Sequence, residues 1–211
     1  MITDILNNLT EALQAMSLVE VIGVITGIAG VWLAAKQHIG TWLLGLVSVA
    51  MYVWIFYDVR LYADMGLQIF YFFTSIYGWY SWRYGGKNHS EIKVSRITKQ
   101  EFILSAILGV LFTAVLGYFL ENFTNADLSY IDSATTAVSL IGYWMMARKK
   151  LENWLLWLAV DAVYVGIYYY KDLYLTSFLY FVFLILATKG YIDWKKEYIQ
   201  SQNAVTPLNA C

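Results

Sequence analysis

An aspartate in the middle of an apolar stretch is the first feature of the sequence that could carry chemistry. Asp161 is ninth of the eighteen residues of the stretch 153–170, which contains no other charged residue. In a helix, at 100° per residue, it shares one face with the aromatic residues Trp154, Trp157, Tyr164 and Tyr168. A carboxylate among aromatic rings suits a flat cationic ligand, which would gain roughly 0.5–2 kcal/mol per ring contact. The alternative is that Trp154 belongs to an interfacial belt and Asp161 is a packing group bonded to a neighbouring helix.

Weaker candidates lie on two other apolar stretches. Gln68 shares a helical face with Tyr71 and Ser75, and its amide offers donors and an acceptor to an amide or aminopyrimidine edge. A glutamine that only bonds across helices would explain the same pattern. Ser48 is a weaker candidate still. In the first half of the sequence, the helical face that corresponds to the Asp161 face carries Trp42, Gly45, Val49 and Tyr52.

Several chemistries have no residues to support them. The sequence contains no phosphate-binding glycine loop, no metal-spaced cluster and no nucleophile–base pair, and His38 and His89 both fall in loops. The one cysteine is Cys211, so no disulfide or cysteine metal site is expected. With a net charge of −1, nothing indicates nucleic-acid binding. We expect neither an enzyme nor a bound cofactor or metal.

Composition and segment length indicate an all-α membrane protein. Apolar residues make up 60% of the chain and charged residues 14%, and crossing a bilayer takes about 20 largely apolar residues in a helix. No signal peptide is expected, because no basic n-region precedes the first apolar run. Seven segments qualify as transmembrane helices: Leu18–Ala35, Thr41–Tyr57, Ala63–Trp82, Glu101–Phe119, Ile131–Ala147, Asn153–Tyr170 and Ser177–Trp194.

The distribution of Lys and Arg predicts the orientation. With the N-terminus outside, the outer loops hold only Arg60 and Lys171, whereas twelve Lys and Arg residues lie on the other side. The positive-inside rule therefore predicts an outer N-terminus and a cytoplasmic C-terminus.

The two halves of the sequence resemble each other. Positions 20–83 align with positions 132–195 without a gap, and the aligned pairs include Trp42 with Trp154 and Trp82 with Trp194. The alignment moves each helix on by four crossings, so both copies have the same orientation, as in transporters built from parallel repeats with a site at the repeat interface. A duplicated bundle without a pathway is the alternative.

The repeat also predicts how the chain is organised. We expect an amphipathic segment 1–17, a three-helix repeat 18–84, a loop and linker helix 85–128, a second repeat 129–196 and a polar tail 197–211, with the tail loose from Gln200. The linker helix is needed to return the chain to the correct side of the membrane before the second repeat begins.

The motifs on both halves resemble the PnuC family of bacterial vitamin transporters. The resemblance rests on the runs Val19–Ala35, Trp42–Tyr57 and Ile76–Trp82 in the first half, and on Asp132-Ser133 and Glu152–Trp157 in the second. It implies the three-plus-one-plus-three layout of full-length SWEET transporters. It also implies residence in the bacterial inner membrane, facilitated diffusion by alternating access, and trapping of the vitamin by a cytoplasmic kinase. The chain could also form a homo-oligomer.

The resemblance also implies site residues and raises the question of substrate. A family motif Trp-x-x-Trp-x-x-x-Asn lines the substrate site; Trp154 and Trp157 match it, Asp161 replaces the Asn, and Gln68 matches a family Gln. Ser48 stands where riboside carriers tend to have Asn. A carboxyl group can accept from the amine of thiamine and attract its cation, so thiamine is the predicted substrate and nicotinamide riboside the alternative.

Two rival functions come from other classes. A retinal photoreceptor would need a Schiff base on Lys189 and an aspartate one turn earlier, where Ile185 stands. We expect the Lys189 side chain to extend to water instead. The other rival is a membrane enzyme or a sensor that transports nothing.

Overall fold

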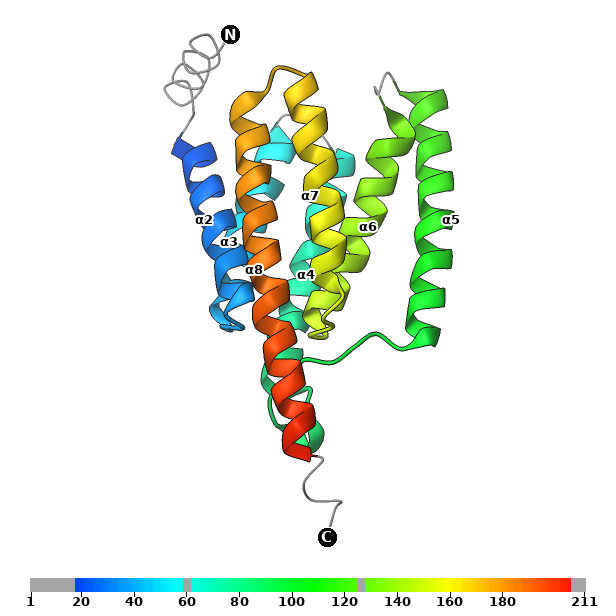
Figure 1. Ribbon diagram of the computed structural model, residues 1–211. Coiled ribbons are helices and arrows are strands. Elements are labelled where there is room, and N and C mark those ends of the chain that lie inside the picture. Colours follow the sequence, from blue (N-terminus) through cyan, green and yellow to red (C-terminus); the bar gives the residue numbers. More distant parts are fainter. Residues whose placement is uncertain (1–17, 59–61, 125–127, 206–211) are drawn as a thin grey trace.

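The chain is a bundle of long helices, described for residues 18–58, 62–124 and 128–205 in a computed structural model (Figure 1). These residues form no strand, and the prediction of an all-α protein of seven long helices is confirmed. The expected amphipathic segment 1–17 lies outside the described residues. The helices are α2 (Leu18–Ala35), α3 (Gly40–Asp58), α4 (Tyr62–Tyr84), α5 (Lys99–Phe123), α6 (Ser129–Ala147), α7 (Asn153–Tyr170) and α8 (Tyr174–Val205), with a short 3₁₀ turn, η1 (Lys87–His89), after α4.

Helix ends differ from the predictions where polar residues continue a helix. The bounds of α2 and α7 are as predicted, but α8 runs to Val205, so the expectation of a loose tail from Gln200 is wrong for its first turns. Residues 191–206 contain neither glycine nor proline, the two residues that most often end a helix. At the start of α5, Thr98 accepts from the Glu101 amide and the Glu101 carboxylate accepts from the Thr98 amide. This capping box sets the helix start before the first apolar residue.

The outer surface of the bundle is apolar. On α5, Phe102, Val110 and Val115 are 61%, 69% and 71% exposed, far more apolar surface than a soluble monomer presents. By length and composition, Lys99–Phe123 and Tyr174–Asn203 are sufficient to cross a membrane, and α2 and α3 contain shorter apolar stretches. The exposed face of the bundle therefore suits contact with lipid.

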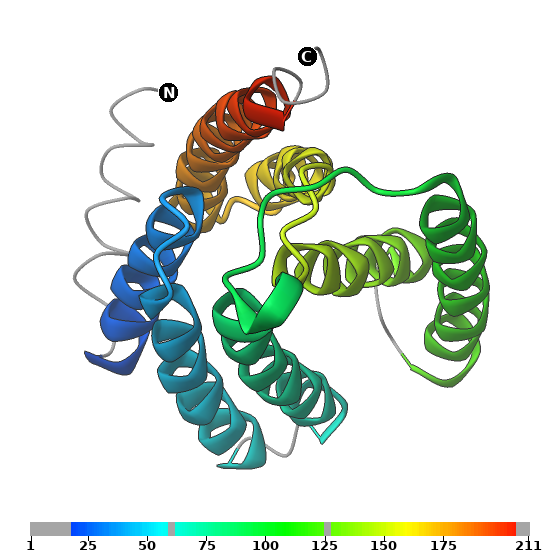
Figure 2. The same cartoon turned by 90° about the horizontal axis from the view of Figure 1, so that it is seen from below.

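Six of the helices form a closed ring. Each of α2, α3, α4, α6, α7 and α8 packs against the next in that order, and α8 packs back against α2. Seen from below, α5 lies outside the ring and packs against α6 (Figure 2). We call the end of the ring that carries the connection between α4 and α5 (residues 85–98) the lower end, as it is drawn in Figure 1.

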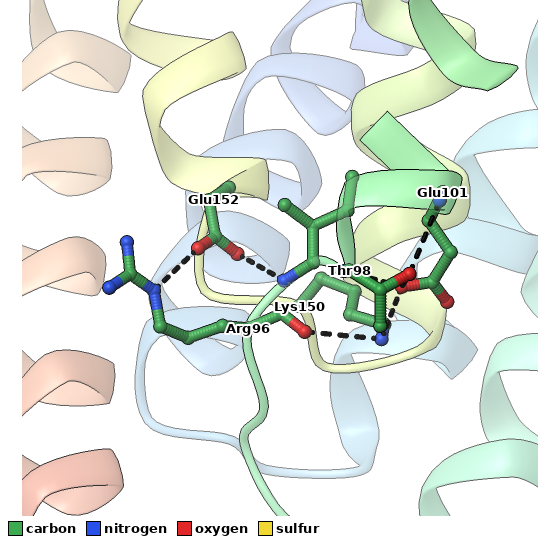
Figure 3. A network of polar contacts seen from close by, with 6 residues as sticks. Arg96, Thr98, Glu101, Lys150 and Glu152 are labelled. Atoms are coloured by element: carbon green, nitrogen blue, oxygen red, sulfur yellow. Dashed lines mark hydrogen bonds and ion pairs between the residues drawn. The ribbon is translucent and has the colours of Figure 1, made fainter. Parts of the chain in front are cut away.

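The connection 85–98 is fixed to the turn between α6 and α7. Ser95 pairs with that turn through two backbone hydrogen bonds, from the Ser95 amide to Lys149 and from the Leu151 amide to Ser95. Side chains add the ion pairs Arg96–Glu152 and Lys150–Glu101, each at 2.9 Å (Figure 3). The lower end of the second half is thus tied to the chain that leaves the first half.

Residues that the repeat relates make matching contacts at the lower end. The Trp82 indole donates to the Met146 carbonyl at 3.0 Å, and the Trp194 indole donates to the Ala34 carbonyl at 3.1 Å. In the alignment of the two halves, Trp194 is the equivalent of Trp82 and Met146 is the equivalent of Ala34. Each half therefore donates to the equivalent carbonyl of the other. A parallel repeat would produce this pairing, and the repeat stays a prediction.

Candidate functional site

The ring encloses a cavity of about 400 Å³ whose walls come from all six of its helices. Small residues on α2 and α3 open the space on one side, among them Gly27, Gly30 and Gly45. Larger aromatic and polar side chains of α4, α6, α7 and α8 line it on the other. Such a concave, mostly apolar space with a few polar groups is the usual form of a small-molecule site.

Seven of the eight site residues predicted from the sequence line this cavity. They come from three helices that are distant in the sequence: Ser48 and Tyr52 on α3, Gln68 and Tyr71 on α4, and Trp154, Trp157 and Asp161 on α7. The structure therefore brings them together around one space.

Asp161 is the one residue with a formal charge among those that line the cavity. It is 5% exposed, and no ion pair joins it to a Lys or Arg among the described residues. A carboxylate in such surroundings is stabilised by a cation that enters beside it. The electrostatics of the lining thus favour a positively charged ligand.

The two tryptophans of α7, Trp154 and Trp157, differ in how deeply their rings are buried. Trp154 is 1% exposed, and its ring is covered by Gly190 and by the edge of Trp194, whose ring centroid lies 5.4 Å away. Trp157 is less buried and lies beside Gly142, where even an added Cβ would stay 3.5 Å from its ring. Trp157 is therefore the tryptophan with ring surface for a ligand, and Trp154 anchors the helix beneath it.

Tyr164 is the predicted residue that does not line the cavity. Its hydroxyl donates to Thr135 of α6 at 3.1 Å, and its ring lies 4.8 Å from that of Tyr180. The structure does not bring Tyr164 to the wall, because these two contacts hold it behind Tyr180. Tyr180 lines the cavity in its place.

Sequence reasoning missed three aromatic residues of the wall: Tyr143, Tyr180 and Phe183. The repeat indicated two of them, since Tyr180 and Phe183 are the equivalents of Gln68 and Tyr71 in the second half. Tyr143 lies near the end of α6, where a tyrosine is easily taken for part of an interfacial belt.

A buried layer closes the cavity at its lower end. Trp82 and Trp194 pack edge-on with centroids 5.9 Å apart, beneath Ala34 and Met146 of the cavity wall. Lys149, only 7% exposed, donates to Gln37 at 2.9 Å and lies 4.8 Å from the centre of the Trp82 ring. Burial lowers the pKa of Lys149, while Glu197 and Glu91 act in the opposite direction.

Lys189 is placed away from the cavity. Its side chain is 45% exposed and forms an ion pair with Asp193 at 3.2 Å, one turn further along α8. A retinal lysine would have to project into the ring, so this position speaks against the photoreceptor. Among the described residues, no group of three or more His, Cys, Asp or Glu could hold a metal ion.

Similarity to known proteins provides evidence on function that does not depend on the cavity. The family model described as nicotinamide mononucleotide transporter matches residues 17–196. The nicotinamide riboside transporter PnuC of Escherichia coli is 26% identical over 85% of this chain and 85% of its own length. The riboflavin/roseoflavin transporter RibM of Streptomyces davaonensis is 25% identical over 83% of each chain. A crystal structure of the vitamin B3 transporter PnuC, 25% identical, superimposes with a TM-score of 0.69 over 93% of this chain and 90% of that one.

A ring of helices around a polar and aromatic cavity, with relatives of this kind over nearly the whole chain, defines a membrane transporter. The chain belongs to the nicotinamide mononucleotide transporter family, which includes the PnuC proteins.

Proposed function

We propose that the chain carries a flat, cationic vitamin across the membrane, with nicotinamide riboside as the first candidate. The cavity carries this proposal: Asp161 is the sole formal charge of its lining, and Trp157 offers ring surface beside it. The substrate named for the E. coli relative and for other PnuC proteins favours the riboside over the thiamine that the sequence predicted.

Thiamine is the second candidate because of Asp161. In riboside carriers of the resembled family an Asn occupies this position, and an amide can both donate to and accept from a hydroxyl or carboxamide. A carboxylate only accepts, which suits the exocyclic amine and the cationic ring of thiamine. A family that also contains a riboflavin transporter at 25% identity leaves room for such a change of substrate.

The proposed mechanism is facilitated diffusion by alternating access. The ligand enters from the upper end, lies against Trp157 with Asp161 and Gln68 at its polar groups, and leaves through the lower end once the layer of Trp82 and Trp194 parts. We place the lower end in the cytoplasm because the basic residues gather there. Phosphorylation by a cytoplasmic kinase would then retain the vitamin.

The experiment is a titration of the purified full-length chain in detergent, following quenching of tryptophan fluorescence by each vitamin, and then uptake into proteoliposomes. Wild type should bind one of the two cations. If that cation is thiamine, Asp161→Asn should weaken its binding by roughly tenfold or more, as expected for a lost charge-assisted contact. If it is the riboside, Asp161→Asn, which introduces the residue of the riboside carriers, should leave binding intact. Thiamine binding that survives Asp161→Asn in full would refute the role of Asp161. Failure of both vitamins to bind or to accumulate would refute the proposed function.

A further inference from the structure

The hydroxyl of Ser75 fixes the hydrogen-bond polarity of a neighbouring tyrosine. Ser75 lies on α4, fully buried, and its Oγ is 2.7 Å from the Tyr71 carbonyl and 2.8 Å from the Tyr143 hydroxyl. A serine hydroxyl has one hydrogen, and a carbonyl can only accept. The Ser75 hydrogen therefore goes to Tyr71, so in the second contact Tyr143 donates and Ser75 accepts.

Tyr143 is left as an acceptor. Its single hydroxyl hydrogen is used toward Ser75, so only oxygen lone pairs remain for a ligand. The position of its oxygen is fixed, because the ring is packed edge-on against Trp42 and Tyr71 with centroids 5.7 and 5.0 Å away. The cavity thus has a neutral acceptor at a fixed position.

Gly45 approaches this acceptor closely. A Cβ placed on Gly45 would lie 3.2 Å from the Tyr143 hydroxyl oxygen. The equivalent position in the second half is Trp157, whose ring fills its own part of the cavity. Gly45 and Tyr143 both line the cavity, so the acceptor belongs to a residue of the wall that a ligand would contact.

We infer that Tyr143 is a specificity-determining residue that accepts a hydrogen bond from an N–H or O–H group of the substrate. The inference rests on the proposed function and deepens it. A carboxamide or an aromatic amine would satisfy the Tyr143 oxygen, whereas a carboxylate or ring carbonyl in its place would set two acceptors against each other. The carrier therefore distinguishes an amide from the corresponding acid, and an amine from the corresponding oxo compound.

Two matched ligand pairs test this on the purified full-length protein. Nicotinamide riboside is compared with nicotinic acid riboside, and thiamine with oxythiamine, in which a carbonyl replaces the pyrimidine amine. Wild type should prefer the donor-bearing member of the pair it binds. Tyr143→Phe keeps the ring and should lower binding of the donor-bearing member by roughly tenfold, the size of one hydrogen bond. Binding of its counterpart should stay the same or rise, because the opposing acceptor is gone.

Ser75→Ala provides a second variant with a different expected result. It frees the Tyr143 hydrogen, so binding of the acid or oxo compound should rise and the preference should narrow. Tyr164→Phe is the control, since that hydroxyl lies behind the cavity wall and both ligands should bind as before. An unchanged preference in both Tyr143→Phe and Ser75→Ala would overturn the inference while the proposed function stands. If wild type bound neither nicotinamide riboside nor thiamine, the proposed function would fail and the inference with it.

Discussion

Trp82 and Trp194 lie with ring centroids 5.9 Å apart, and each donates its indole N–H to a carbonyl of the other half of the chain. Both rings are buried, at 3% and 0% exposure. The two halves are therefore joined at their lower end by a reciprocal pair of hydrogen bonds in addition to packing.

Replacing either indole should have nearly the same effect. In Trp82→Phe and Trp194→Phe a buried carbonyl loses its donor, and each variant should lose about 1–3 kcal/mol of stability. Thermal unfolding in detergent measures the loss. A second measurement uses a cysteine placed at Val49 in the cavity, on a Cys211→Ser background. This cysteine should react faster with a maleimide added from the lower side in either Trp→Phe variant than in the protein that keeps both tryptophans. A large loss in one variant and none in the other would contradict the reciprocal arrangement.

Gly78 and Gly190, which lie against the rings of Trp42 and Trp154, should not tolerate a larger residue. A Cβ at Gly78 would lie 2.5 Å from the Trp42 ring, and a Cβ at Gly190 would lie 2.6 Å from the Trp154 ring. Gly78→Ala and Gly190→Ala should each cost about 1–3 kcal/mol through overpacking. Gly166→Ala is the control, because its Cβ would meet nothing within 4 Å. Equal melting temperatures for all three variants would show that the rings shift at no cost.

Trp157 should contribute to ligand binding more than to folding. Trp157→Ala removes the ring surface beside Asp161 and should weaken binding of the transported cation by roughly threefold to thirtyfold. Trp54, which is 74% exposed on α3, serves as the control, and Trp54→Ala should leave affinity unchanged. Calorimetric titration measures the affinity of both variants for the transported cation. An unaltered affinity in Trp157→Ala would show that Trp157 does not contribute to binding.

The two ion pairs of Figure 3 should differ in strength. The Lys150 and Glu101 side chains are 10% and 21% exposed, whereas that of Arg96 is 65% exposed. Glu101→Gln leaves a nearly buried ammonium without its anion and should cost about 1–3 kcal/mol, although glutamine can retain the capping box. Arg96→Gln should cost less than about 1 kcal/mol, as is usual for an exposed pair. Urea unfolding measures both losses, and the ranking would be refuted if Arg96→Gln proved less stable than Glu101→Gln.

Burial of Lys149 should make stability depend on alkaline pH. Its pKa in the folded protein lies below the ordinary value of 10.5. Between the two values the unfolded chain holds a proton that the folded chain has lost, so stability rises with pH in that window. Lys149→Gln removes the effect, and the stability of wild type relative to this variant should increase as pH approaches 10.5. If the stabilities of wild type and Lys149→Gln changed in parallel with pH, the pKa of Lys149 would not be lowered by folding.

The sequence predicted the helices and seven residues of the cavity wall, but not how individual rings are used. The bounds of α2 and α7 followed from short polar turns, and Asp161 stood out because a charge in mid-membrane is costly. The burial of Trp154 could not be predicted in this way, since Gly190, which covers it, belongs to another helix, α8. Tyr143 was missed for a related reason: its role depends on Ser75 and Gly45, which belong to two other helices.

Substrate identity is the part that single residues predicted least well. The change from Asn to Asp at position 161 suggested thiamine, and the similarity to nicotinamide riboside transporters suggests the riboside. Both ligands are cationic and both carry an N–H donor, so neither Asp161 nor Tyr143 separates them alone. The shape of the remaining wall around Gly27, Gly30 and Phe183 must contribute.

The difference between Gly45 and Trp157, at equivalent positions of the two halves, fixes how many ways a ligand can lie. If the halves were identical, a half-turn about the axis between the two parallel halves would relate two equivalent orientations of an asymmetric ligand, with the same end toward the exit in both. Giving up the second orientation costs only RT ln 2, about 0.4 kcal/mol. In exchange, every bound molecule turns the same side toward Gly45 and the same side toward Trp157, so one arrangement of polar side chains serves each molecule that crosses.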